Sequence, residues 1–572
     1  MKSRTTELQS GKKASFYSSI TQGGTTMKSD VRKRSMSLAL VVTVILALVT
    51  PVAAWAQVIP WYEIPTNLPD YIGHPAKPHP SPNSGVPQNP LLAPDPFSHT
   101  HFDPWMSDTA NIAGPLGRDP EVLSSRLDEA RNPDSDEWVF NCISIGFDSH
   151  GRPISVCLNP KEATVVLIDP DTLDVVSKYS LDIPPGPPYK GDGRQKFLTS
   201  MGNIYSYLDA SDRFTVASGG NQILTLVEGG SEESPVLELL EGNTYDLKEI
   251  LPETNPIVSG TILDWQGRIW FATPDPATIW VLNPATFQKG DPDSVKRVEL
   301  APDEAIRNTF ALTKIEGGRT AAYVVTSKQM YRVDAGPDDQ PYKVWSEPYK
   351  SNENEEVRLG QYEVGSGTSP TILGEGKYVA ITDDNTQLQV VVFRTDERLD
   401  PNEERIVCEV PVFDFPGGGN GALSNSLIGS RLSLIASNNY NYWFDWELEN
   451  GKLRSPSAPG FERIDIEPNG RSCRKVWTNT EVATTVSPRL STKTGLIYTI
   501  ARKLDEETLI DGKPLEVYYW TAIDFRTGET VWQKRAGTGS EFDSFYPALG
   551  IGPNGALYSG GYGRFMSVRD TR

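Results

Sequence analysis

The sequence predicts an all-β chain that folds as a β-propeller of four-stranded blades, with eight blades favoured and seven as the alternative. Gly and Pro number 48 and 45 among 572 residues, a content that suits many turns and few long helices. From about residue 138, short apolar runs alternate with Gly, Asp and Asn turns, which is typical of β-strands. A strand-ending turn also recurs at intervals that accommodate four short strands, and such sheets bury both faces only when packed radially.

The recurring turn begins with an Asp or Asn whose side chain accepts backbone hydrogen bonds within the turn. Its clearest copies are Asp169-Pro-Asp-Thr, Asn283-Pro-Ala-Thr and Asp524-Phe-Arg-Thr. Looser equivalents lie near Glu228, Asp334, Asp396, Glu449 and Asp570. These eight positions predict one blade each.

A second motif predicts the hairpins within blades. It occurs as Asp148-Ser-His-Gly151-Arg, Asp264-Trp-Gln-Gly267-Arg and Asn554-Gly555, and each copy separates two short apolar runs, as a hairpin turn does. The last unit, from Tyr546 to Asp570, has room for three strands only. We therefore expect its fourth strand to come from the N-terminal segment.

We divide the chain into three parts: a signal region over 1–56, a Pro-rich extended arm over 57–135, and the propeller over 136–572. The first part contains Arg32-Lys-Arg34, a 12-residue apolar run from Leu38 to Val49, and Ala54-Trp-Ala56 before Gln57, the pattern of a cleaved secretory signal. The run is shorter than the roughly 17–25 residues of a spanning helix. Met27 is an alternative start to Met1.

These features predict a secreted or periplasmic protein with no transmembrane segment after cleavage. The absence of any Asn-x-Ser/Thr sequon favours a bacterial source over a eukaryotic secreted one. The whole chain carries a net charge of −20. Residues 1–56 hold eight Lys/Arg and two Asp/Glu, so the mature chain carries −26, which makes nucleic acid a poor partner.

The four cysteines predict two disulfides in an oxidising compartment. Cys142 and Cys157 lie on either side of the Asp148–Gly151 hairpin, equidistant from its centre. We expect both on one face, with the run from Ile143 to Phe147 presenting its apolar side chains on the other. Cys408 and Cys473 form the second bridge by elimination, and four free thiols are the alternative.

Residues 522–532, Ala-Ile-Asp-Phe-Arg-Thr-Gly-Glu-Thr-Val-Trp, resemble the repeat of quinoprotein-like (PQQ-like) β-propellers, and residues 470–477 form a looser copy. The resemblance covers about residues 138–572 and implies the fold more than an activity. The chain is also similar to a group of secreted bacterial propellers of unestablished activity. We expect Trp520 and Trp532 to pack between blades.

The cofactor of the quinone-binding members is not expected here. Those members hold PQQ with a vicinal Cys-Cys disulfide and a Ca²⁺, and some carry a Cys-x-x-Cys-His haem motif. This sequence contains neither Cys pattern. The resemblance therefore leaves PQQ an unlikely cofactor.

The first candidate site lies in the arm, at His99-Thr-His101-Phe-Asp103. Alternation in an extended segment would bring two imidazoles and a carboxylate to one side, a set that suits Zn²⁺ or non-haem iron. The alternative is that these polar residues fix the arm across the axial opening of the propeller, with Trp105 and Asp108.

The second candidate site comes from polar residues within otherwise apolar inner strands, which line a propeller's channel. They are Ser366, Thr368, Asp383 and Asp384, and, one blade later, Asn425, Ser426 and Asn439. Such groups suit a small polar ligand or Ca²⁺. The alternative is that they satisfy backbone groups in turns.

Taken together, these patterns predict an exported, monomeric binding module for a small polar ligand or a protein partner. The alternative is an enzyme with its site at the axial opening. It would be a metal-assisted hydrolase or lyase using His99, His101 and Asp103, or less readily a quinone-dependent oxidoreductase. The sequence names no substrate.

Overall fold

The computed structural model describes residues 64–127, 141–158, 163–182, 204–232, 234–251, 255–257, 259–352, 357–361, 364–442, 457–510, 512–544 and 546–572. All of them belong to the unit Glu63–Arg572. The predicted signal over 1–56 lies outside the described residues. Within the described ranges, no helix is long and apolar enough to cross a membrane.

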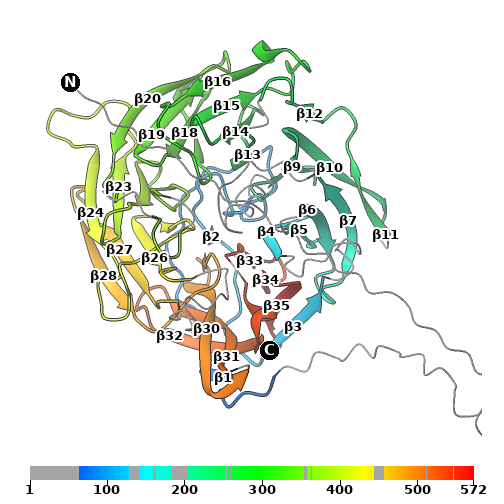
Figure 1. Cartoon of the computed structure of the whole chain (residues 1–572), viewed down its shortest axis with the longest axis vertical. Helices are drawn as coiled ribbons and strands as arrows, with labels where there is room; N and C mark the ends of the chain where they lie inside the picture. The colour runs from blue at the N-terminus through cyan, green and yellow to red at the C-terminus, as the bar shows by residue number, and fades with distance from the viewer. Residues whose placement is uncertain are drawn as a thin grey trace, which may run out of the picture. The chain divides into compact units, whose positions relative to one another are not determined.

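Eight antiparallel sheets follow one another around a ring (Figure 1). Each blade runs from an inner strand next to the axis to an outer strand at the rim, and blade 8 contacts blade 1 through β34 and β4. The prediction of an all-β propeller with eight blades is confirmed, and seven blades are excluded.

The first four blades are continuous in sequence. Blade 1 is β4 (Asn141–Phe147), β5 (Pro153–Leu158), β6 (Ala163–Ile168) and β7 (Val175–Leu181). Blade 2 is β8 (Tyr207–Leu208), β9 (Phe214–Ser218), β10 (Gln222–Ser231) and β11 (Ser234–Leu239), with β12 (Tyr245–Asp246) also pairing with β10. Blade 3 is β13 (Ser259–Leu263), β14 (Ile269–Thr273), β15 (Thr278–Leu282) and β16 (Val295–Glu299), with the 3-10 turn η2 (Pro292–Ser294) before β16. Blade 4 is β17 (Ala311–Ile315), β18 (Arg319–Val325), β19 (Gln329–Ala335) and β20 (Pro341–Pro348), with η3 (Glu316–Gly318) between its first two strands.

Of the remaining four blades, blades 5 and 6 are continuous in sequence, and blades 7 and 8 include strands from the N-terminal segment. Blade 5 is β21 (Thr371–Leu373), β22 (Tyr378–Thr382), β23 (Gln389–Arg394) and β24 (Ile406–Pro411). Blade 6 is β25 (Ile428–Ser430), β26 (Ser433–Ser437), β27 (Phe461–Ile466) and β28 (Cys473–Asn479). Blade 7 is β29 (Arg489–Ser491), β30 (Leu496–Ile510), β31 (Lys513–Asp524) and β32 (Thr530–Thr538), followed by η4 (Ser540–Phe542). Blade 8 is β33 (Gly550–Ile551), β34 (Leu557–Gly561), β35 (Arg564–Asp570) and β3 (Pro120–Arg126).

The arm supplies the missing outer strand of blade 8, as predicted. β3 pairs antiparallel with β35 from Pro120 opposite Asp570 to Arg126 opposite Arg564. The arm also adds β1 (Tyr71–Gly73) to the outer edge of blade 7 and β2 (Thr109–Ala110) in parallel to its inner strand. These two additions were not predicted, because strands of two or three residues leave no periodic pattern.

The core lies between blades. The inner three strands of most blades are buried on both faces, while outer strands such as β7 and β16 alternate buried and exposed side chains. Trp520 and Trp532 are fully buried in one cluster with Leu549, Ile551 and Leu557 of blade 8. The expectation that these tryptophans pack between blades is confirmed.

The predicted turns form as side-chain caps. Oδ1 of Asp169 accepts hydrogen bonds from the backbone amides of Asp171 and Thr172, and Asp524 does the same for Arg526 and Thr527. Of the looser equivalents, Glu228 and Asp334 lie within β10 and β19 rather than in turns. The one near Glu449 lies outside the described residues.

The hairpin motif carries an Arg that the sequence reading did not use. Asp264 caps the amides of Gln266 and Arg268, and its other oxygen accepts from Nε of Arg268 at 2.7 Å. Asp148 and Arg152 repeat this geometry in blade 1. Blade 2 contains a third copy, Asp209 with Arg213. It was missed because Asp212, at φ 57°, stands where the other copies have Gly.

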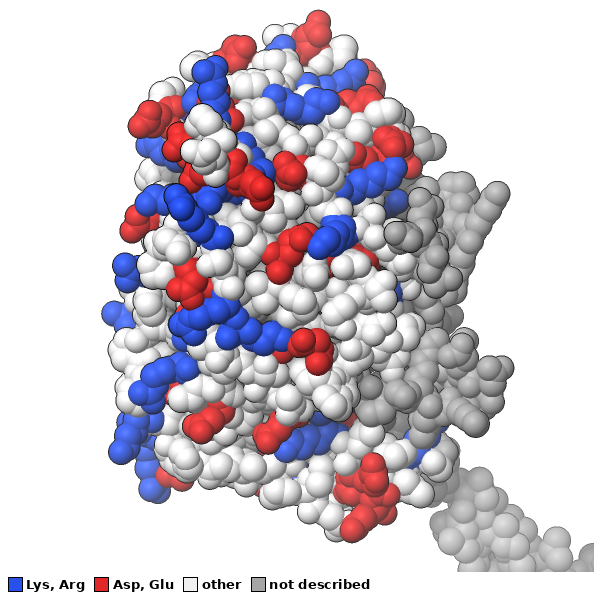
Figure 2. All heavy atoms as spheres, turned by 90° about the vertical axis from the view of Figure 1, so that its left-hand side faces the viewer, with Lys and Arg blue, Asp and Glu red and all other residues white. Residues whose placement is uncertain are grey.

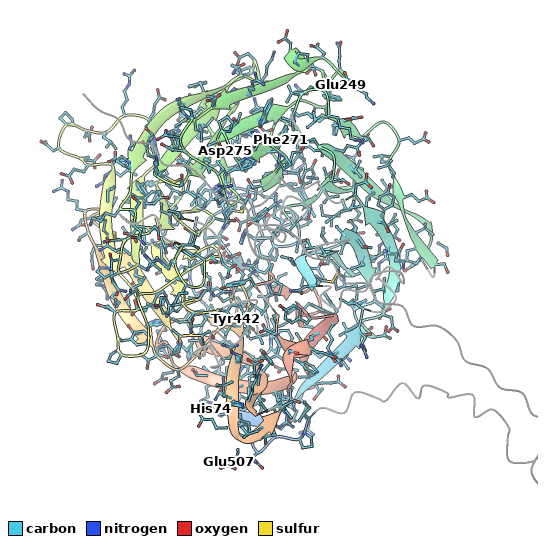
Figure 3. The ribbon with its side chains drawn as sticks, viewed as in Figure 1. His74, Glu249, Phe271, Asp275, Tyr442 and Glu507 are labelled. Atoms are coloured by element: carbon cyan, nitrogen blue, oxygen red, sulfur yellow. A yellow bond between two sulfur atoms is a disulfide. The ribbon has the colours of Figure 1, made fainter. Side chains whose placement is uncertain are left out.

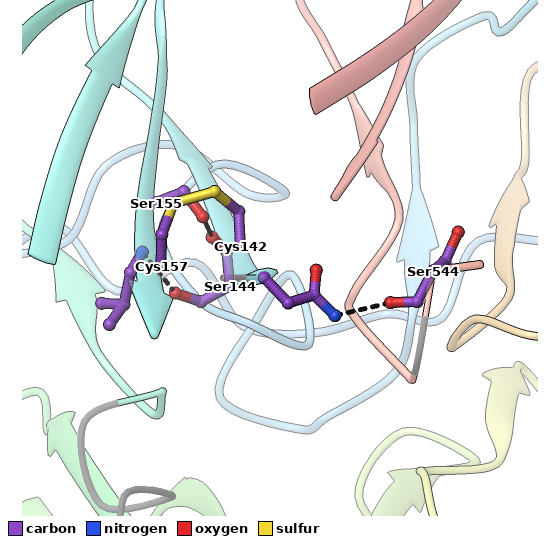
Figure 4. The surroundings of a disulfide bond; sticks show 7 residues. Cys142, Ser144, Ser155, Cys157 and Ser544 are labelled. Atoms are coloured by element: carbon purple, nitrogen blue, oxygen red, sulfur yellow. Dashed lines mark hydrogen bonds between the residues drawn. A yellow bond between two sulfur atoms is a disulfide. The ribbon is translucent and has the colours of Figure 1, made fainter. Parts of the chain in front are cut away.

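Both predicted disulfides are present. Cys142 and Cys157 face each other across the β4–β5 pair (Figure 4), and Cys408 of β24 is joined to Cys473 of β28, which links blades 5 and 6. The predicted face of Ile145 and Phe147 is wrong, since both lie in the same cluster as the two cysteines. A β-bulge between Cys142 and Ser144 inserts one residue and reverses the alternation.

The rim shown in Figure 2, on the side of β24 and β28, carries both signs of charge interspersed. Ion pairs such as Lys350 with Glu409 and Lys475 with Asp414 contribute to this pattern. No single sign dominates this face, despite the chain's net negative charge.

Candidate functional site

The arm fills the channel of the propeller. Residues 97–110 run around its inner wall, where their carbonyls accept hydrogen bonds from inner-strand amides of six blades. These are Phe97 O from Phe147, Ser98 O from Leu208, Pro104 O from Leu312, Trp105 O from Ile372, Ser107 O from Gly429 and Asp108 O from Leu490. The light-blue trace inside the ring in Figure 1 is this segment. Backbone groups that would otherwise face solvent in the channel are thus satisfied by protein.

The arm enters from the end of the ring where the first hairpin of each blade turns. Leu92 forms a bridge with Asp209, Ser430 donates to Pro82 O, and Trp265 donates to Gln88 O. Successive strands are antiparallel, so the loops between the second and third strands and the connections between blades lie at the opposite end. The two ends of the channel therefore differ in what covers them.

Trp105 anchors the arm and does not face a ligand space. It is buried in the core cluster of blades 3 to 5, and its indole nitrogen donates to Thr313 Oγ1 at 2.9 Å. This placement matches the alternative in which Trp105 fixes the arm.

Inside the ring, His101 and Asp108 of the arm meet Arg489 of β29 and two serines that lie just before the inner strands of blades 5 and 6. His101 Nδ1 lies 3.0 Å from Asp108 Oδ1 and 3.0 Å from Ser426 Oγ, and its Nε2 lies 3.4 Å from Ser369 Oγ. Ser426 also donates to Asp108, and Arg489 forms an ion pair with the same carboxylate. All five side chains are buried.

His101 lies between Asp108 and Ser369 and contacts both, as the histidine of a Ser-His-Asp catalytic triad contacts its serine and aspartate. Two observations argue for a structural interpretation instead. Ser369 is 0% exposed, and the carboxylate of Asp108 is already shared with Arg489 and Ser426. We call these five side chains the axial cluster, and we interpret them as the contacts that hold the arm to blades 5, 6 and 7.

The structure does not bring the three predicted metal ligands together. Asp103 accepts hydrogen bonds from the amides of Trp105 and Ser107 and from the Ser107 hydroxyl. His99 Nδ1 lies 2.8 Å from Ser98 Oγ, whereas His101 is committed to Asp108. The local chain turns between these residues, with Phe102 at φ 73°, so an extended alternation does not apply.

The pKa shifts at these residues follow their burial. Burial, assisted by nearby His101, lowers the pKa of His99 to about 3. Burial and the neighbouring carboxyl of Asp95 raise the pKa of Asp103 well above its usual range. A metal ion needs a neutral imidazole and an ionised carboxylate, so the raised pKa of Asp103 opposes cation binding, whereas the lowered pKa of His99 does not.

Among the described residues, one group of three has ligand atoms within 4.8 Å of one another: Asp148, His150 and Glu228. Arg152 lies between them. It donates to Asp148 at 2.8 Å, contacts His150 Nδ1 at 3.2 Å and forms an ion pair with Glu228. The guanidinium occupies the position a metal ion would need, so this group is a hairpin-stabilising network.

The second predicted set of residues gathers at the end of the ring opposite the entry of the arm, on blades 5 and 6. Thr368 Oγ1 accepts from the amide of Thr382 and bonds to Ser366, and Asp384 Oδ2 accepts from the amide of Gly365 at 2.9 Å. In blade 6, Asn439 Oδ1 accepts from the amide of Ser424 at 3.2 Å. The two blades thus repeat the same pairing between an inter-blade connection and a strand loop.

Many polar atoms here are buried without a hydrogen-bond partner. Of nineteen buried side-chain atoms in the described residues that make no hydrogen bond, eight belong to this region: Arg358 Nε, Gln361 Oε1, Thr382 Oγ1, Asp383 Oδ2, Asp384 Oδ1, Asn425 Nδ2, Ser437 Oγ and Asn439 Nδ2. Two of these, Arg358 Nε and Asp384 Oδ1, lie 3.4 Å apart in an ion pair, which leaves six without a partner. Buried polar atoms in proteins are nearly always paired. We call these residues, with Ser366, Thr368 and Ser424, the blade 5–6 polar site.

Three of the unpartnered groups surround one short segment. Gln361 Nε2 donates to Leu423 O at 3.4 Å, which puts the free Oε1 of the same amide beside that residue. Asn439 holds the amide of Ser424 through Oδ1, so its free Nδ2 lies nearby. Asn425 follows directly, and Arg358 reaches the carbonyls of Asn420 and Gly421.

The residues of this site differ in burial. Asp383, Asp384, Asn439 and Gln361 are fully buried, whereas Ser366, Asn425 and Ser424 retain 7–9% exposure. Burial raises the pKa of Asp383 to about 7, against backbone hydrogen bonds that lower it. The pKa of Asp384 is also raised by burial. The sequence reading missed Arg358 and Gln361, which lie in the connection before Gly365 and show no motif.

A separate aromatic network joins blades 6, 7 and 8. Tyr442, on the inner side of the ring (Figure 3), and Tyr518 both donate to Asp543, and Tyr546 packs against Tyr442 with ring centroids 4.6 Å apart. Burial raises the pKa of Glu516, the ion-pair partner of Arg502, to about 7. Tyr546 also donates to Gly360 O, so this network supports the edge of the blade 5–6 polar site.

Comparison with known proteins finds a relative in sequence and several structures of similar fold. No family model matches the chain. An uncharacterized protein of Archaeoglobus fulgidus is 27% identical over 391 residues, which are 64% of this chain and 66% of that protein, just under two thirds of its length.

Solved structures similar to this chain are propellers that carry different names. Quinohemoprotein alcohol dehydrogenase from Comamonas testosteroni aligns with a TM-score of 0.47 at 10% identity, over 85% of this chain and 82% of that one. BamB from Moraxella catarrhalis aligns with a TM-score of 0.37 at 10% identity, over 79% and 98%. A streptogramin B lyase aligns with a TM-score of 0.36 at 10% identity, over 79% and 97%. At these identities the likeness concerns the fold alone.

Proposed function

We propose that this protein is an exported binding module that holds a small polar ligand at the blade 5–6 polar site. The observation that carries the proposal is the concentration of unpartnered buried polar atoms there. An unpaired buried polar group costs roughly 1–3 kcal/mol, so several in one region are best explained by a partner that the chain itself does not supply. Residues that the sequence had singled out, among them Asp383, Asn425 and Asn439, lie within this region.

Export is supported by two independent features. The basic cluster, apolar run and Ala-Trp-Ala over 32–56 match a secretory signal. Both pairs of cysteines are joined in disulfides, which persist in oxidising compartments. We propose a secreted or periplasmic, monomeric protein. The predicted boundaries at 56 and 135 belong to this proposal.

Native mass spectrometry of the purified protein, followed by denaturing non-reducing mass spectrometry, tests both parts. We expect an excess mass in the native spectrum that disappears on denaturation, and a denatured mass four hydrogens below the Gln57–Arg572 chain. The variant Asn425→Asp should lose the excess, because it replaces a donor by an acceptor of the same shape. Asn469→Asp, in an exposed turn of blade 6 where the side chain accepts from Arg471, is the matched control. An excess retained by Asn425→Asp would contradict this site.

A further inference from the structure

The blade 5–6 polar site contains free hydrogen-bond donors, which disfavour a bare cation. The amide nitrogens of Asn425 and Asn439 are unpartnered, whereas the Nε of Arg358 is paired with Asp384. Donor hydrogens carry partial positive charge, and Ca²⁺ needs 6–8 oxygen ligands. In the described part of the chain, the group of three candidate metal ligands that converges lies elsewhere, in the blade 1 hairpin.

The same site contains two carboxylates, which disfavour an anion. Oδ2 of Asp383 is unpartnered, and Oδ1 of Asp384 lies 3.4 Å from Nε of Arg358 in an ion pair. That guanidinium is already used by the carbonyls of Thr386, Asn420 and Gly421. A phosphate or carboxylate ligand would lie next to two acidic side chains. The one cation nearby, Arg358, already donates most of its N–H groups to protein oxygens.

The unpartnered groups of the site that carry no charge include both hydrogen-bond donors and acceptors. Gln361 offers an acceptor, Asn425 and Asn439 offer donors, and Thr382 and Ser437 offer hydroxyls that do either. A ligand hydroxyl donates one hydrogen bond and accepts others, so a molecule with several hydroxyls satisfies such a mixture. An apolar ligand would leave every one of these groups unpaired.

We infer that the ligand of the blade 5–6 polar site is a small uncharged polyhydroxylated molecule of the sugar or cyclic polyol class. This inference rests on the proposed function and narrows it. The fully buried Asp383, Asp384 and Asn439 would contact its hydroxyls, and the less buried Ser366 and Asn425 would contact the part nearest to solvent.

Isothermal titration calorimetry of the full mature chain tests this class with stated probes: D-glucose, D-galactose, D-mannose, trehalose and myo-inositol, against CaCl₂ and inorganic phosphate. We expect at least one of the neutral polyols to bind, and Asn425→Asp to weaken that binding about tenfold or more, since a buried hydrogen bond is lost. Asn469→Asp should bind as the wild type does. Circular dichroism establishes that Asn425→Asp is folded, and Asn425→Ser, which keeps a donor, should bind more tightly than Asn425→Asp.

The other outcomes overturn the inference in distinguishable ways. Binding of Ca²⁺ or of phosphate that Asn425→Asp changes would overturn the polyol class and leave the proposed binding function in place. A bound molecule of another class in the native mass spectrum would do the same. Binding of no probe, with no excess mass in the native spectrum, would overturn both.

Discussion

Arg489, on the inner strand of blade 7, forms an ion pair with Asp108 of the arm inside the channel, and both side chains are 0% exposed. Its guanidinium also donates to the carbonyls of Thr100 at 2.6 Å and Leu549 at 3.0 Å. One buried cation thus connects two points of the arm with blades 7 and 8. This pair, together with His101, explains how a Pro-rich segment that contains only three short strands in its described part is fixed in the axis of the propeller.

Replacing Arg489 by Met should destabilise the protein by about 3–5 kcal/mol, because it leaves the Asp108 carboxylate buried without its cation. Denaturant unfolding followed by tryptophan fluorescence measures this change. The double variant Arg489→Met with Asp108→Asn should recover part of the loss. Asp303→Asn, which removes an exposed ion pair with Lys328, should leave stability unchanged. A stability of Arg489→Met equal to that of the wild type would contradict the claim that the axial cluster holds the arm in place.

Deleting residues 57–135 should prevent cooperative folding. The deletion removes β3, the outer strand of blade 8, and the carbonyls that pair with inner strands of six blades. A narrower variant, Asp570→Ala, removes the carboxylate that accepts the amides of Leu116, Gly117 and Arg118, and should cost about 1–3 kcal/mol. A soluble deletion fragment with a sharp thermal transition would show that the propeller closes without its arm.

The two disulfides should differ in their contribution to stability. In the loop-entropy treatment, a cross-link over the 15-residue separation of Cys142 and Cys157 contributes about 3 kcal/mol, and one over the 65 residues between Cys408 and Cys473 contributes about 4. We expect Cys142→Ser to lower the unfolding free energy by about 2–4 kcal/mol and Cys408→Ser to lower it at least as much. Melting temperatures of both variants check the order, and an unchanged value for either would be evidence against its bridge.

The contribution of Asp383 to stability should fall as the pH rises from about 4 to about 7, while that of His99, whose pKa burial lowers to about 3, should rise as the pH approaches 6.5. Burial raises the pKa of Asp383 from 3.8 to about 7, so in this interval the folded protein holds a proton that the unfolded chain has released. The stability contributed by protonated Asp383 is fully present below about pH 4 and is lost as the pH passes 7. Other buried carboxyls with raised pKa, such as Glu516, add to the slope. Between pH 4.5 and 7.5, the melting temperature of Asp383→Asn relative to that of the wild type should rise with pH, whereas that of exposed Asp338→Asn should not.

The repeated local features of the fold could be predicted from the sequence. The Asx turns at Asp169 and Asp524 are complete within a few residues, so their signal survives without tertiary context. The disulfide between Cys142 and Cys157 followed from hairpin symmetry. The fourth strand of blade 8 followed from counting strands. Each of these depends on short-range geometry or on closure of the ring.

The candidate site was predictable only in part. Asp383, Asn425 and Asn439 were visible as polar residues in apolar strands, but Arg358 and Gln361 come from an irregular connection. The pairing of Asp108 with Arg489 joins residues 381 positions apart, and no local pattern indicates it. The metal site at His99 and His101 was predicted on the assumption that the arm is extended there. The chain instead turns at Phe102.

A crystal structure of the purified mature protein, at a resolution that shows ordered small molecules, tests the central claim most directly. The account predicts non-protein density within hydrogen-bond distance of Gln361 Oε1, Asn425 Nδ2 and Asn439 Nδ2, with the shape of a small hydroxylated molecule after soaking with the polyol that binds. The contradicting result is a site in which these three side chains pair with protein groups and no density lies between blades 5 and 6.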